Sequence, residues 1–186
     1  MKRVQRVALQ RFREQGFDAV TVEEIAAVAE VSPMSVYRWF GTKESLVIWD
    51  EFDPPILSAV AHRLATHAPL DAVRDALVDL LDDVYDRERD IALDRARLIY
   101  AEPALLAAAD RNARALRTAL AEVFTEGGVP TDRARIVVAV AGSLLEVAVD
   151  AWQRDDGRRP LADLLTDVFA THATLRDGAA STVEYA

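Results

Sequence analysis

Apolar side chains recur along almost the whole chain at the three- and four-residue spacing that places them on one face of a helix. No long segment shows the two-residue alternation that a half-buried strand requires. The pattern therefore predicts an all-α protein of about nine helices, in which a few short helices are followed by a bundle of longer ones.

Three short helices separated by tight turns are predicted in the first forty residues. The first ends at Gly16, a residue type favoured at helix C-termini. Thr21 and Glu24 have the spacing of a capping box, in which each side chain accepts a backbone N–H at the start of the second helix. Ser32 is expected to cap the third helix, which ends at Phe40. The turn between the second and third helices is therefore only a few residues long.

A fourth helix is expected to begin near Lys43, after the capping residue Thr42. It should reach Asp50 or slightly beyond, because Pro54 and Pro55 follow and proline interrupts a helix. Beyond these prolines the apolar stripes predict a helical bundle. Its helices are expected around residues 73–84, before residue 100, and at 105–124, 133–153 and 161–175.

Composition is that of a folded globular protein, with 51% hydrophobic and 28% charged residues. The absence of cysteine excludes disulfides, cysteine-ligated metals and a thiol nucleophile. The histidines, His62, His67 and His172, lie outside any metal-binding or nucleophile motif. We therefore expect no catalytic residue, no metal site and no cofactor, and the protein is not expected to be an enzyme.

The net charge of −9 argues by itself against a nucleic-acid partner, because phosphate binding usually leaves a basic surface. Residues 1–50, however, contain seven cationic and seven acidic side chains, so all the excess acid lies beyond residue 50. The N-terminus lacks the apolar segment of a secretory signal, and the apolar run at residues 136–149 is too short to span a membrane. A cytoplasmic protein without a membrane partner is expected, whose first part is able to approach DNA.

Residues 21–46 have the pattern of a helix-turn-helix. Small Ala26 lets the second and third helices cross closely, while Val36 and Phe40 are positioned to pack the third helix onto Phe12 of the first. Burial of these positions leaves a mixed polar, apolar and aromatic set around the start and outer face of the third helix, the part of such motifs that enters the major groove. This set comprises Ser32, Pro33, Met34, Ser35, Tyr37, Arg38 and Trp39.

The same segment resembles the DNA-binding domain of the TetR family of transcriptional regulators. The resemblance covers about residues 4–50 and rests on the order Gly, T-x-x-x-I-A, A-x-V-S-x-x-x-x-Y-x-x-F and K-E-x-L. The matching positions are Gly16, Thr21, Ile25, Ala26, Ala29, Val31, Ser32, Tyr37, Phe40, Lys43, Glu44 and Leu46. The resemblance implies a DNA-binding domain at residues 1–46 and an effector-binding and dimerisation domain at 47–176, with a flexible tail expected at 177–186.

The resemblance implies that Thr21, Tyr37 and Lys43 bind phosphates. It also implies a set that lies over base edges, namely Pro33, Met34, Ser35 and Trp39. With Ser32 and Arg38 these residues form the predicted DNA-binding surface.

Each of these assignments has a structural alternative. Thr21 and Ser32 act as helix caps whether or not they touch DNA. Tyr37 and Trp39 have aromatic side chains, which in a helix are more often buried in the core than in contact with DNA. Lys43 has the alternative of a solvated surface charge.

A homodimer is implied by the family resemblance, which pairs the last two helices with their copies in a four-helix bundle. The sequence agrees, because a helix that is apolar on nearly every side needs partners on more than one face. The alternative is that this helix forms the centre of a monomeric core. The predicted interface residues are Ile136, Val140, Leu144, Leu161, Leu164, Leu165, Val168, Phe169 and His172.

An effector pocket is expected among the middle helices, with aromatic residues as walls. The candidate lining residues are Trp49, Phe52, Tyr85, Tyr100, Phe124, Glu146 and Trp152. Glu146 interrupts an apolar run, so it binds the ligand, pairs with an arginine across the dimer or faces solvent. The segment WDEFDP at residues 49–54 is similar to actinobacterial TetR members associated with redox-cofactor or acyl-thioester metabolism. A small, partly apolar effector of unknown identity is expected.

Together these features predict a TetR-type repressor that binds a palindromic operator as a homodimer and is released by its effector. A regulator whose effector tightens DNA binding, and a helical adaptor that binds only protein, are the alternatives.

Overall fold

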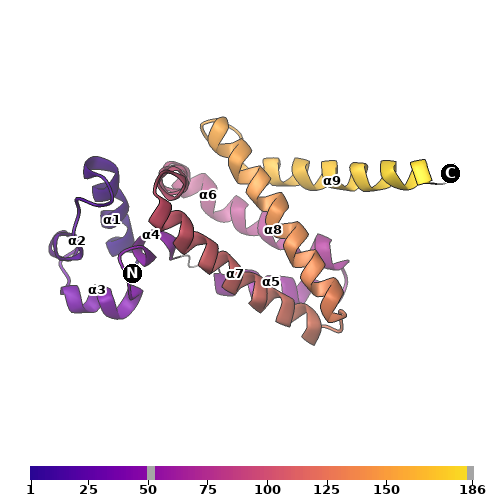
Figure 1. Cartoon of the computed structure of the whole chain (residues 1–186), viewed down its shortest axis with the longest axis horizontal. Helices are drawn as coiled ribbons and strands as arrows, with labels where there is room; N and C mark the ends of the chain where they lie inside the picture. The colour runs from indigo at the N-terminus through magenta and orange to yellow at the C-terminus, as the bar shows by residue number, and fades with distance from the viewer. Residues whose placement is uncertain (50–52, 184–186) are drawn as a thin grey trace. The chain divides into compact units, whose positions relative to one another are not determined.

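The computed structural model describes the backbone of residues 1–49 and 53–183, with the side chains of these except 53, 54, 83–87 and 177–183. Over the described residues the chain is helical and contains no strand, which confirms the predicted all-α class (Figure 1). The helices are α1 (Lys2–Gln15), α2 (Val22–Val28), α3 (Pro33–Phe40), α4 (Ser45–Ile48), α5 (Asp53–Arg63), α6 (Pro69–Ala101), α7 (Pro103–Glu126), α8 (Thr131–Arg154) and α9 (Leu161–Val183).

The chain forms two compact units. Unit 1 contains Met1–Glu51 and Glu88–Ala115, and unit 2 contains Phe52–Arg87 and Leu116–Ala186. Unit 1 is therefore larger than the predicted domain of residues 1–46. Helix α6 passes from one unit to the other at Glu88, where the backbone leaves helical geometry (φ −125°, ψ 24°). The break at Glu88 separates the two helices predicted on either side of it, which α6 joins across the kink.

The core of unit 1 is made by α1 to α4 together with residues that follow the kink. Val4, Ala8 and Phe12 of α1 are buried in one cluster with residues of α2, α3 and α4. Leu105 at the start of α7 belongs to the same buried cluster, and Ile91 of α6 packs against it. Residues that lie more than fifty positions later in the sequence therefore pack on the core of the helix-turn-helix, which no local pattern indicates.

Helix α4 is shorter than predicted, because it ends at Ile48 and Trp49 leaves helical conformation (φ −51°, ψ 125°). The predicted extension to Asp50 falls on a residue outside the described part of the chain. Pro54 and Pro55 do not terminate a helix but lie in the first turn of α5. Proline is tolerated there because first-turn N–H groups have no partner within the helix.

The core of unit 2 is lined by α5, the first part of α6, the second part of α7, α8 and α9. Phe124 and Trp152 are almost completely buried, and α8 packs against α9 through buried Leu161, Leu165 and Phe169. Helix α9 continues to Val183, beyond the start of the predicted tail at residue 177, and the flexibility of that tail stays a prediction.

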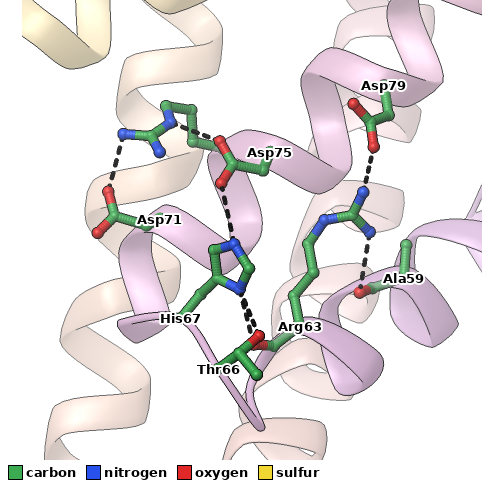
Figure 2. Close-up of polar contacts among 8 residues, drawn as sticks. Ala59, Arg63, Thr66, His67, Asp71, Asp75 and Asp79 are labelled. Carbon is green, nitrogen blue, oxygen red and sulfur yellow. Dashed lines mark hydrogen bonds and ion pairs between the residues drawn. The ribbon is translucent and has the colours of Figure 1, made fainter.

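A polar network joins α5 to the start of α6 (Figure 2). The Arg63 guanidinium donates to the Ala59 carbonyl and to the Asp79 carboxylate, while His67 Nε2 lies 3.7 Å from an Asp75 oxygen. Arg74 donates to Asp75 at 2.7 Å and holds the pKa of that carboxyl below its ordinary value. His67 is thus part of a structural network that fixes the turn.

No helix in the described part of the chain is both long and apolar enough to cross a membrane.

Candidate nucleic-acid interface

The start of α2 is fixed by the predicted capping box. The Glu24 N–H donates to Thr21 Oγ1 at 3.2 Å, and the Thr21 N–H donates to Glu24 Oε2 at 2.7 Å. The Thr21 hydroxyl also donates to Glu24 Oε2 at 2.9 Å. Thr21 is therefore a helix cap in the structure, as its sequence context predicted, and its exposed position leaves phosphate contact as a prediction.

Replacement of Thr21 by alanine is expected to lower the free energy of unfolding by about 1 kcal/mol, because α2 loses its N-cap acceptor. Thr21→Ser keeps a hydroxyl at the same place and should retain most of the stability. Denaturant unfolding followed by circular dichroism compares the two variants. Equal stability of the alanine and serine variants would contradict the capping role.

The Glu24 carboxylate responds to pH in a direction set by the same contacts. The Thr21 N–H and hydroxyl lower the pKa of Glu24, because both donate to its ionised form. A lowered folded-state pKa means that this stabilisation is present above the unfolded-state pKa and is lost as the pH falls through the folded-state value. The cap is therefore intact at neutral pH.

The turn between α2 and α3 is tight. The Val31 N–H donates to the Ala26 carbonyl at 3.0 Å, and Glu30 takes the left-handed conformation (φ 57°) that the turn requires. The Glu30 carboxylate pairs with Arg3 of α1 at 2.7 Å. The orientation of α3 relative to α2 is thus set by backbone bonds and by buried Ala26 at the crossing.

The first turn of α3 is capped by Ser32, whose hydroxyl accepts the Ser35 N–H at 3.1 Å. Pro33 occupies the first helical position, as predicted from its missing N–H. The Ser32 and Ser35 hydroxyls also hydrogen-bond to each other at 3.0 Å. These two serines, both predicted to face DNA, are therefore engaged within the turn.

The outer face of α3 is exposed. Val36 and Phe40 are buried in unit 1, whereas Met34, Tyr37 and Trp39 retain 76%, 45% and 37% exposure. The alternative in which Tyr37 and Trp39 belong to the core is therefore not what the structure shows. Arg38 is also exposed, so the face predicted to enter the major groove is accessible.

Lys43 is held by its own chain. Its ammonium donates to the Phe17 carbonyl at 2.5 Å and lies 4.4 Å from the centre of the Phe17 ring, which adds a cation–π contact. The side chain ties the loop after α1 to the start of α4. Lys43 is therefore a positioning residue in this structure, and phosphate contact stays a prediction.

The Lys43→Ala variant should separate these two roles. We expect the free energy of unfolding to fall by about 1 kcal/mol, because the Phe17 carbonyl loses its partner. The slope of log affinity against log salt should stay unchanged if the ammonium stays on Phe17. A slope reduced by about one would identify Lys43 as a phosphate ligand instead.

Long-range contacts that the sequence did not indicate hold α1 and α4 in place. Arg13 of α1 pairs with Asp94 at 2.8 Å, and Arg6 pairs with Glu88 at 3.3 Å. Arg95 donates to the Ile48 carbonyl at 3.1 Å at the end of α4. Helical periodicity in the sequence gives no indication of ion pairs between residues about eighty positions apart. These positioning residues are therefore evident only from the tertiary structure.

The predicted pocket residues are divided between the two units. Phe124 and Trp152 are buried in the core of unit 2, and their role as pocket lining stays a prediction. Trp49 is partly buried in unit 1, with its ring 5.9 Å from that of Phe40 in an edge-on arrangement. Tyr100 is about half exposed. The side chains of Phe52 and Tyr85 lie outside the described part of the chain.

A groove of about 430 Å³ lies in unit 2 beside the loop between α7 and α8. Pro69, Val129, Ile136 and Val137 contribute much of its lining, and none of them was a predicted pocket residue. Glu146 is exposed on α8, which fits the solvent-facing alternative within a single chain.

The predicted dimer residues divide into two groups. Leu161, Leu164, Leu165 and Phe169 are buried within unit 2, which leaves these side chains little surface for a partner. Ile136 by contrast is 63% exposed. The remaining residues, Val140, Leu144, Val168 and His172, are half-buried.

The short crossing of α2 and α3, with an accessible outer face on α3, defines a helix-turn-helix transcriptional regulator. Residues 6–48 match the family model described as bacterial regulatory proteins, tetR family, and residues 67–177 match the model of the MftR C-terminal domain. The chain belongs to the TetR family.

Known relatives agree with this membership. The HTH-type transcriptional regulator TcmR of Streptomyces glaucescens is 34% identical over 158 residues, which cover 79% of this chain and 70% of TcmR. FadR of Thermus thermophilus, solved in complex with lauroyl-CoA, is 21% identical, with 91% of each chain covered and a TM-score of 0.52. FadR of Bacillus halodurans is 18% identical, with coverage of 90% of this chain and 94% of that one and a TM-score of 0.55. The two solved structures share the fold.

Proposed function

We propose that this TetR-family regulator is a repressor that binds a palindromic operator as a homodimer and is released by a small, partly apolar effector. The exposed outer face of α3 is the observation that carries the proposal. Tyr37 and Arg38 supply polar groups on this face, and Met34 supplies an apolar one. Such a mixed surface suits the edges and phosphates of a major groove.

An exposed apolar stripe on α8 supports the homodimer. Apolar Ile136, Val140 and Val147 and the small polar Ser143 recur at intervals of four, three and four residues, so they share one face of the helix. Ile136 and Val147 remain 63% and 52% exposed in the single chain. A second copy would remove this surface from water, and its two-fold axis would place two copies of α3 on the half-sites of a palindrome.

Release by an effector is supported by the family, whose members respond to small molecules. The FadR proteins of Thermus thermophilus and Bacillus subtilis were solved with lauroyl-CoA and stearoyl-CoA, ligands that combine an apolar chain with a polar carrier. The apolar lining of the groove beside α7 and α8 fits the first of these features. We propose an effector of the same mixed character, without naming it.

Operator binding is tested by selection of bound duplexes from random DNA with the full chain, followed by gel-shift assays. The expected outcome is a palindromic site bound with strong dependence on salt. Binding of protein partners without any preferred DNA site would favour the helical-adaptor alternative and overturn the proposal.

The direction of regulation is tested on the selected site with lauroyl-CoA as the first probe, followed by smaller apolar acids. A probe that binds the DNA-free form better must weaken the DNA complex, because the two equilibria are linked. A probe that tightens the complex would establish the co-repressor alternative.

A further inference from the structure

The first turn of α3 presents an apolar surface at the point where a recognition helix meets base edges. Met34 is 76% exposed, the largest exposed fraction among the large apolar side chains identified in the described part of the chain. Pro33 beside it is also exposed and has no backbone N–H to donate. Exposure of a large apolar side chain to water is unfavourable, and burial against a partner would remove that cost. The exposed Met34 therefore points to a binding partner for this side chain.

The polar groups of this turn are directed to one another. Ser32 Oγ accepts the Ser35 N–H at 3.1 Å, and the two hydroxyls are 3.0 Å apart in a hydrogen bond. The side chain best placed to meet a base from this turn is therefore Met34, whose thioether and methyl groups cannot act as donors.

The major-groove edge of DNA offers one apolar group, the C5-methyl of thymine. We propose that Met34 reads thymine in each half-site by packing against this methyl group. The inference rests on the proposed operator binding and deepens it, because it predicts which base one position of each half-site must carry.

Arg38 lies four residues after Met34 and is exposed on the same side of α3. An arginine there contacts bases or phosphates through its guanidinium, which does not depend on a thymine methyl. Substitution of Arg38 therefore provides a matched control, because it should change DNA affinity independently of the thymine methyl group.

Deoxyuridine substitution tests the proposal on the selected operator. Uracil keeps every hydrogen-bonding group of thymine and lacks only the methyl. We expect one thymine per half-site at which the replacement weakens binding of the full chain by about fourfold, the loss of roughly one buried methyl group. Met34→Ala should bind the thymine and uracil operators with equal affinity, whereas Met34→Leu should retain the preference.

The outcomes separate this inference from the proposed function. Arg38→Ala should weaken binding to both operators and leave their ratio unchanged. A specific complex that is indifferent to uracil at every position would overturn the role of Met34 while operator binding stands. A preference for thymine that survives in Met34→Ala would overturn it as well. Absence of any specific complex with the unmodified chain would overturn both.

Discussion

If the chain forms the proposed homodimer through α8, glutamate at both Ile136 and Val147 is expected to convert it into a monomer and to weaken operator binding about 10²- to 10⁴-fold. The two side chains lie on the exposed apolar stripe of α8, so a dimer through this face would bury four carboxylates close to a two-fold axis. A monomer binds one half-site at a time. It loses the high effective concentration at which the second subunit of a dimer meets the second half-site. Sedimentation equilibrium gives the mass, and gel-shift titration gives the affinity.

Arg135→Glu is the matched control, because it places the same side chain at an exposed position of α8 one residue before Ile136. One residue corresponds to about 100° around the helix, so the substitution lies off the stripe. We expect this variant to remain dimeric. A double variant that stays dimeric and binds the operator normally would place the interface elsewhere.

Phe12→Ala is expected to lower the free energy of unfolding by about 3 to 5 kcal/mol. Phe12 is 1% exposed in the core of unit 1, and its ring centre lies 4.9 Å from that of Phe17. Truncation leaves a cavity beneath the helix-turn-helix, at a cost that is a large share of the roughly 5 to 15 kcal/mol that stabilises a typical domain. Specific operator binding should fall with the folded population.

The control for this prediction is Gln15→Ala, an exposed position near the end of the same helix. Its effect should stay within about 0.5 kcal/mol, because no buried contact is lost. Denaturant unfolding of both variants, read by circular dichroism and by operator binding, separates a core effect from a change in helix propensity. A Phe12→Ala variant as stable as the unmodified chain would show that α1 does not form the centre of this core.

The local sequence was sufficient to predict those features that a single short segment determines. Thr21 with Glu24 predicts the start of α2, and Ser32 with Pro33 predicts the start of α3, because capping bonds close within four residues. The outer face of α3 followed from the same local pattern, since Val36 and Phe40 had to face the core. Family membership could be predicted for the same reason, because the family's sequence signature lies within the helix-turn-helix segment.

Long-range packing decided the features that no short segment encodes. The kink at Glu88 lets the second half of α6 and Leu105 cover the helix-turn-helix, and Asp94 pairs with Arg13 across a gap of eighty residues. The Lys43 ammonium donates to the Phe17 carbonyl, a contact across 26 residues that no local pattern predicts. Burial depends on which helix happens to lie opposite a side chain, and periodicity shows only that a face is apolar.

The chain's sequence thus sufficed to define an all-α TetR-family regulator, its caps and the exposed surface of its third helix. Which aromatic side chains are core was settled by packing, with Phe124 and Trp152 buried inside unit 2. The reason is physical: capping and helical spacing are properties of a few neighbouring residues, whereas burial and ion pairing arise when distant segments meet.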